Sequence, residues 1–160
     1  MHFAAKRSII VPAPNGYFLY CITTVMIVKK ISAREGLFPM LTNYHTHTTR
    51  CGHAEGTEEE YILTALRCGY KVLGFSDHTP WAYATPGFVS HIRMLPAQLD
   101  DYVLTLRSLR EKYADRLHLH IGLEAEYFPA YLGWLKEETE RLGIEYLILG
   151  CHYDTTDEQD

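Results

Sequence analysis

The chain lacks several features that would assign it to a common class. Its 160 residues include 15 basic and 20 acidic residues, and the net charge is −5 with the histidines neutral. No run or helical face of basic residues is present, so neither a nucleic-acid backbone nor an anionic membrane is expected as the main partner. Its composition, 47% hydrophobic and 22% charged, is that of a globular domain that can bury a core.

Cysteine patterns typical of zinc ribbons and disulfide frameworks are also missing. The chain has no C-x-x-C pair and no repeated short spacing among its four cysteines, which are Cys21, Cys51, Cys68 and Cys151. We therefore expect a reducing compartment, the cytoplasm. We interpret Cys51 and Cys151, which adjoin candidate ligands, as small residues that fill space. The sequence also has no Gly-x-Ser-x-Gly elbow, cysteine-phosphatase loop or glycine-rich phosphate cradle, which disfavours a Ser or Cys nucleophile and a nucleotide site.

No hydrophobic run is long enough to span a bilayer. The longest candidate, Tyr17 to Val28, has 12 residues, whereas a transmembrane helix needs about 20. A signal peptide would require a small-residue cleavage site after the run, but the chain continues with Lys29-Lys30. We interpret Met40 as the natural start. Residues 1–39 are then an extension outside the fold, and residues 40–160 form the functional domain.

Histidines, by contrast, are frequent. Nine are present, and three of them, His45, His47 and His53, fall within nine residues beside a predicted strand end. Successive strand side chains alternate between faces, so His45 and His47 point the same way and can bind one ion. His53 follows a glycine-containing turn and can reach a second ion. The alternative interpretation is a polar loop that happens to contain histidines.

From Met40 onward, short apolar runs alternate with amphipathic stretches, the pattern of β/α units in a mainly parallel sheet. Four strands are expected, at residues 41–45, 71–76, 117–124 and 145–150. The first helix begins at Thr57, where Glu60 completes a capping box, and it ends before Gly69. A second helix places five apolar residues on one face, Leu99, Tyr102, Val103, Leu106 and Leu109. Gly143 ends a third helix. Residues 154–160 are expected to be frayed.

Every predicted strand delivers candidate ligands at its carboxyl end. These residues are His45, His47, Asp77, His78, Glu124 and His152. Because active sites of parallel β/α folds lie at that edge of the sheet, we expect one shared pocket. Imidazoles and carboxylates without thiolates suit zinc, manganese or iron, and several such ions close together suit hydrolysis of a phosphate ester.

Other polar residues near these strands are expected to play different roles. Asp77 faces the opposite way from His78 and is predicted to orient a neighbour rather than bind metal. His118 and His120 share the face of Glu124, but His120 lies roughly 13 Å below it at about 3.3 Å per residue, which excludes it. His91 is interpreted as a substrate contact or an exposed residue.

The sequence resembles the PHP (polymerase and histidinol phosphatase) family, specifically its monofunctional histidinol-phosphatases. The resemblance runs from about Met40 to the end of the chain. The motifs that carry it are Tyr44-His45-Thr46-His47-Thr48, Gly52-His53-Ala54-Glu55-Gly56-Thr57, Gly74-Phe75-Ser76-Asp77-His78, Gly122-Leu123-Glu124-Ala125-Glu126-Tyr127 and Gly150-Cys151-His152-Tyr153. It implies a distorted seven-stranded β/α barrel that binds up to three divalent ions (Zn, Mn or Fe).

The resemblance also implies a ligand set and a substrate. His45, His47 and Glu124 would bind the first ion, and His53 and His78 the second. Glu124, bridging, would bind the third with His152, and Glu124 and His152 are the predicted catalytic residues. The implied substrate is L-histidinol phosphate, hydrolysed to histidinol and phosphate in histidine biosynthesis.

Two further residues are predicted to bind substrate. Arg93 lies where a phosphate-contacting guanidinium would be useful, and its planar fork suits that anion. The alternative is a surface arginine. Glu126 lies one pleat beyond Glu124 and could pair with a cationic substrate group; the alternative is a solvated side chain.

The family pattern continues with a further histidine and a final Asp-x-His, which this chain does not contain. Four strands cannot close a seven-stranded barrel, so we interpret the chain as the N-terminal part of a longer enzyme. Alternatives are a PHP phosphatase for phosphotyrosine or another small ester, and an inactive metal-binding fragment. A polymerase-associated PHP domain is disfavoured because no basic nucleic-acid surface follows. The sequence leaves the oligomeric state open.

Overall fold

The computed structural model describes residues 9–13, 17–22, 25–30, 42–52, 54–153 and 155–158. The first three of these ranges form an antiparallel sheet of β1 (Ile9–Ala13), β2 (Tyr17–Ile22) and β3 (Val25–Lys30). The apolar run noted in the sequence falls on β2 and β3. Among the described residues, no helix is both long and apolar enough to cross a membrane. The assignment of residues 1–39 to an extension outside the fold stays a prediction.

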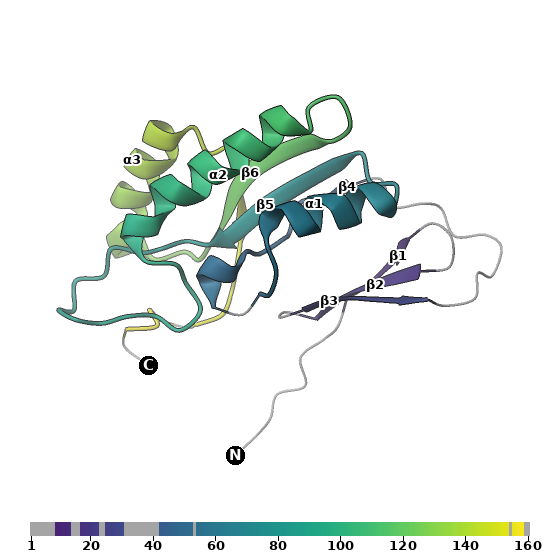
Figure 1. The fold of residues 1–160 in the computed structure, drawn as a ribbon. Coiled ribbons are helices and arrows are strands. Elements are labelled where there is room, and N and C mark those ends of the chain that lie inside the picture. Colours follow the sequence, from purple (N-terminus) through teal and green to yellow (C-terminus); the bar gives the residue numbers. More distant parts are fainter. Residues whose placement is uncertain are drawn as a thin grey trace, which may run out of the picture.

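A second sheet contains four parallel strands in sequence order: β4 (Thr42–Asn43), β5 (Val72–His78), β6 (His118–Ala125) and β7 (Tyr146–Leu149). The connecting helices are α1 (Glu58–Arg67), α2 (Leu99–Lys112) and α3 (Leu132–Leu142). Crossovers between parallel strands are right-handed, so sequential strand order places these helices on one side of the sheet, as Figure 1 shows. The predicted α/β fold, a partial β/α barrel, is confirmed.

Local sequence signals account for the helix boundaries. Thr57 caps α1 as predicted: Glu60 N donates to Thr57 Oγ1 at 3.2 Å, and Thr57 N donates to Glu60 Oε2 at 2.7 Å. Gly143 ends α3 with a φ of 56°, a left-handed conformation that favours glycine. Short 3₁₀ turns occupy η2 (Thr49–Cys51), η3 (Pro96–Gln98) and η4 (Pro129–Tyr131).

The hydrophobic core lies between the helices and the parallel sheet. Strand β5 contributes Leu73 and Phe75, both 1% exposed or less, and alternate residues of β6 point to the same side. Helix α2 covers β6 with the face predicted from its periodicity. Leu99, Tyr102, Val103 and Leu106 are buried, and Leu109 is partly buried against the same core. Beside β6, the same side of β7 is less covered, because Leu147 is 48% and Leu149 78% exposed.

On the opposite face of the sheet, one aromatic ring lies across neighbouring strands. Tyr146 on β7 crosses Gly122 of β6 and Gly74 of β5, two positions where no side chain competes for the space. Its hydroxyl shares a single donor hydrogen between the carbonyl oxygens of Tyr44, at 2.7 Å, and Phe75, at 3.0 Å. The ring therefore joins three strands beneath their carboxyl ends.

Candidate metal centre

Four imidazoles surround the carboxylate of Glu124 at the carboxyl ends of the four parallel strands. His45 Nε2, His47 Nε2 and His78 Nδ1 lie 3.0, 3.3 and 3.2 Å from Glu124 Oε2. His152 Nε2 lies 3.4 Å from Oε1. These five residues come from segments that lie between positions 45 and 152, so the fold brings together side chains that are far apart in the sequence.

Strand register explains this convergence. His78 is the last residue of β5 and pairs directly with Glu124 on β6, so their side chains lie side by side on one face. The strand was predicted to end at Ser76, but its pairing with β6 extends it through His78. Gly150 follows β7, and a Cβ there would lie 2.7 Å from the His152 ring and 3.1 Å from Glu124 Oε1. Gly150 is thus needed because His152 and Glu124 lie too close to its backbone for a side chain.

The spacing of these atoms fits a shared cation. Two ligand atoms about 2.0–2.2 Å from one ion lie roughly 2.9–3.5 Å apart in tetrahedral or octahedral geometry. The separations of 3.0–3.4 Å around Glu124 fall in that range. In addition, His45, His47 and Glu124 form a triad with ligand atoms within 4.8 Å of one another. Imidazole nitrogens and a carboxylate are the donors that Zn²⁺ and similar ions accept in proteins.

Burial and neighbouring charges set the protonation of the cluster. Burial alone would raise the pKa of Glu124, but hydrogen bonds from His45 and His47 hold it well below its ordinary range. Burial, reinforced by the charge of His47, lowers the pKa of His78 to about 3. Burial opposes charge on His47 as well, yet its hydrogen bonds, foremost that to Asp77, raise its pKa to about 11. Glu124 is therefore an anion and His78 a neutral imidazole at neutral pH.

Asp77 lies behind His47, on the far side from Glu124. Its fully buried carboxylate accepts hydrogen bonds from the backbone N–H of Thr48, at 2.6 Å, and from the Thr48 hydroxyl. Asp77 Oδ1 is 3.6 Å from His47 Nδ1, the ring nitrogen that points away from Glu124. Cys51 Sγ, also buried, donates to the Thr48 carbonyl at 2.9 Å. Asp77 thus occupies the position expected of a carboxylate that orients a ligand histidine.

Comparison with known proteins identifies the family to which this cluster belongs. A family model described as the PHP domain matches residues 43–160, which include every strand of the parallel sheet except the first residue of β4. The chain belongs to the PHP domain family.

Two curated relatives of this PHP domain are both named "Probable histidinol-phosphatase". The protein from Deinococcus radiodurans is 34% identical over 116 residues, which cover 71% of this chain and 42% of the relative. The protein from Schizosaccharomyces pombe is 29% identical over 115 residues, covering 68% and 38%. The chain therefore spans about two fifths of the length of these relatives.

Two solved structures share the fold of this PHP domain. A Listeria monocytogenes protein superposes with a TM-score of 0.59 and 23% identity over 73% of this chain and 50% of that one. Histidinol phosphate phosphatase from Lactococcus lactis, solved as a complex with Zn, L-histidinol and phosphate, gives a TM-score of 0.56 and 18% identity over 70% and 40%.

The two predicted substrate-binding residues of the PHP domain are buried against each other. Glu126 is 3% and Arg93 5% exposed, and the guanidinium donates to both carboxylate oxygens, at 2.8 and 3.0 Å. The alternatives of a solvated Glu126 and a surface Arg93 are therefore wrong, because each charge is compensated inside the fold. Their contact with substrate stays a prediction.

The tail after β7 departs from expectation. Residues 154–160 were predicted to fray, but Asp157 is only 9% exposed, and its Oδ2 accepts hydrogen bonds from Arg93 Nε, at 3.0 Å, and Ser90 Oγ, at 2.6 Å. Trp81 was also missed as a site residue. It is 2% exposed and its indole N–H donates to Glu126 at 3.2 Å. No pattern in the sequence predicts that an aromatic residue in a proline-rich loop contacts Glu126.

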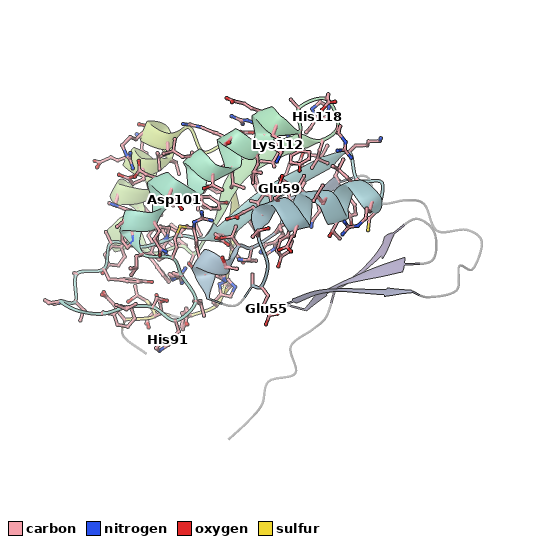
Figure 2. The ribbon with its side chains drawn as sticks, viewed as in Figure 1. Glu55, Glu59, His91, Asp101, Lys112 and His118 are labelled. Carbon is pink, nitrogen blue, oxygen red and sulfur yellow. The ribbon has the colours of Figure 1, made fainter. Side chains whose placement is uncertain are left out.

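The remaining predicted histidines lie apart from the cluster or outside the description. His53, predicted to bind the second ion, lies outside the described residues. His120 Nδ1 is 2.6 Å from Glu145 Oε2, and neither it nor His118 joins a candidate ligand group. Figure 2 shows His118 and His91 at opposite ends of the domain, and both side chains are exposed.

Proposed function

We propose that this PHP domain belongs to a metal-dependent phosphomonoester hydrolase that acts on L-histidinol phosphate. The observation that carries the proposal is the convergence of four imidazoles on the Glu124 carboxylate. The names of the curated relatives and the ligands in the Lactococcus lactis complex support the substrate class. In a cell, we place this enzyme in the cytoplasm, at the phosphate-removing step of histidine biosynthesis.

Up to three divalent ions, Zn, Mn or Fe, would be held by residues of the cluster. We assign His45, His47 and Glu124 to one ion, His53 and His78 to a second, and Glu124, bridging, with His152 to a third. When bound, such ions supply Lewis-acid chemistry: they neutralise charge on phosphate oxygens and make water a stronger nucleophile at neutral pH.

The protein's own groups prepare this chemistry. Glu124 is 4% exposed and ionised, so it supplies a fixed negative charge where cations collect. His78, with its pKa lowered to about 3, offers a neutral nitrogen rather than a proton. Asp77 lies close to Nδ1 of His47 and so favours the orientation in which Nε2 faces Glu124. Glu124 and His152 are the residues we propose to be nearest the reaction.

Phosphate release tests the proposal directly. The purified chain is loaded with Mn or Zn, its metal content is measured, and release from histidinol phosphate is compared with release from phosphotyrosine. We expect His45→Ala and Glu124→Gln to reduce both metal content and turnover by orders of magnitude. His118→Ala removes an exposed imidazole outside the cluster and is the matched control.

Each outcome of this test decides a different point. Metal content unchanged in both variants would refute the ligand assignment, whatever the turnover. Faster release from phosphotyrosine would leave the metal centre intact and replace the substrate. Metal binding without turnover on either ester would identify the chain as a metal-binding fragment, the inactive alternative considered from the sequence.

A further inference from the structure

The carboxylate of Glu126 has no acceptor position left for an ion. Oε1 accepts from Arg93 Nη2 and His152 Nδ1, both at 2.8 Å. Oε2 accepts from Arg93 Nη1 at 3.0 Å and from the Trp81 indole at 3.2 Å. A carboxylate offers about four lone-pair positions, and all four are used here. Glu126, His78 and His152 are close enough to suggest a ligand triad, but these four donors favour a different role for Glu126.

His152 lies between the carboxylates of Glu124, on β6, and Glu126, just after it. Its Nδ1 contacts Glu126 at 2.8 Å and its Nε2 faces Glu124 at 3.4 Å. An ionised carboxylate only accepts hydrogen bonds, so Nδ1 must carry the hydrogen. In the neutral ring the lone pair is then on Nε2, the nitrogen that faces the metal centre. Glu126 therefore selects both the tautomer and the ring orientation of His152.

Arg93 keeps Glu126 ionised and in place. Its side chain is 1% exposed and lies between two carboxylates, those of Glu126 and Asp157. Each Glu126 oxygen meets two donors, which leaves no acceptor for a carboxyl hydrogen, so the group is ionised. Because the guanidinium fork engages both oxygens of Glu126, the carboxylate plane is fixed as well as its charge.

We propose that Glu126 is a positioning residue for His152, held by Arg93, rather than a metal ligand or a substrate contact. Carboxylates that accept from the second nitrogen of a ligand histidine set its tautomer and strengthen it as a ligand. The inference rests on the proposed function only in that His152 is taken to bind a cation. It replaces the predicted substrate roles of Arg93 and Glu126 with an indirect one.

Glu126→Gln is the decisive variant. The amide has the same size, but its NH₂ group must replace one of the two carboxylate oxygens. In the wild type each of these oxygens accepts from Arg93 and from one other donor, His152 or Trp81. With the amide oxygen retained beside Trp81, the NH₂ group faces His152 Nδ1, which must then accept. We expect ¹⁵N NMR of the metal-free protein to show the Nε2–H tautomer of His152, and affinity for Zn to fall about 10- to 100-fold.

Glu59→Gln is the matched control, since Glu59 is on α1 and pairs at the surface with Lys112, as Figure 2 illustrates. We expect it to change neither the tautomer nor the affinity. If Glu126→Gln does not fold, Glu126→Asp keeps the charge beside Arg93 but withdraws the oxygen from Nδ1. Glu126→Asp is then expected to show the same loss of affinity for Zn.

His152→Ala separates the two proposals. If this variant binds Zn like the wild type, His152 is not a ligand and the ligand assignment of the proposed function fails. If His152→Ala weakens binding but Glu126→Gln leaves the tautomer and affinity unchanged, the positioning role is overturned. A Glu126→Gln variant that raises KM for histidinol phosphate, with unchanged Zn affinity and kcat, would instead establish Glu126 as a substrate contact.

Discussion

A single added methyl group at Gly122 is expected to disturb the packing of the Tyr146 ring across the parallel sheet. A Cβ built there would lie 2.5 Å from two atoms of the Tyr146 ring and 2.6 Å from a third. The ring cannot swing away freely, because its hydroxyl is bonded to the carbonyls of Tyr44 and Phe75. Gly122→Ala therefore either strains the sheet or breaks the hydrogen bond that the Tyr146 hydroxyl shares between these carbonyls.

The cost in stability can be worked out from overpacking or from hydrogen-bond loss, and the two ranges overlap. Overpacking a core position costs about 1–3 kcal/mol. Loss of the shared Tyr146 hydrogen bond costs about 0.5–1.5 kcal/mol, which overlaps that range. Urea unfolding followed by circular dichroism measures the change, and a loss of about 2 kcal/mol lowers the midpoint by roughly 1 M at a typical slope. Gly133→Ala is the control: a Cβ in α3 meets nothing within 4 Å, so stability is expected to hold or rise by up to about 1 kcal/mol.

A double-mutant cycle separates the steric cause from a general intolerance of change. On a Tyr146→Ala background the ring is gone, so Gly122→Ala is expected to cost close to nothing, and the two substitutions couple strongly. If Gly122→Ala costs the same with and without the ring, or costs nothing in the wild type, the reasoning is refuted.

Three further outcomes are expected. Thr57→Ala removes the α1 cap, in which Thr57 Oγ1 accepts from Glu60 N, and thermal or urea unfolding is expected to show a loss of about 1 kcal/mol; an unchanged midpoint contradicts the capping role. Asp77→Asn is expected to weaken Zn binding about 10- to 100-fold in chelator competition, and wild-type affinity would exclude it as an orienting group. Because the pKa of His47 is raised to about 11, an ion must displace its proton at neutral pH, so affinity rises with pH. Calorimetry in buffers of different ionisation enthalpy detects that proton, and a buffer-independent heat would argue against it.

The sequence predicts the parallel strands and the cluster around Glu124, but it does not predict the contacts of Arg93 and Glu126 beside that cluster. Alternation placed His45 and His47 on one face, and the recurrence of ligands at strand ends indicated the edge where Glu124 lies. The partners of Arg93 are 33 and 64 residues away, just after β6 and in the tail. Loop packing brings Arg93 and these partners together, and no periodicity in the sequence predicts that packing. The same packing buries Glu126 and Asp157, which composition alone suggested were solvated.

The exposed edge of strand β7 affects how metal binding and stability of this protein are measured. Among the described strands it pairs with β6 only, and the leucines on its helix-facing side, Leu147 and Leu149, are 48% and 78% exposed. A strand edge next to bare apolar side chains is a template on which another molecule can add a strand. Self-association should therefore grow with protein concentration. Sedimentation of a dilution series would reveal self-association. Metal titrations at the lowest workable protein concentration would prevent self-association from being mistaken for a change in metal affinity.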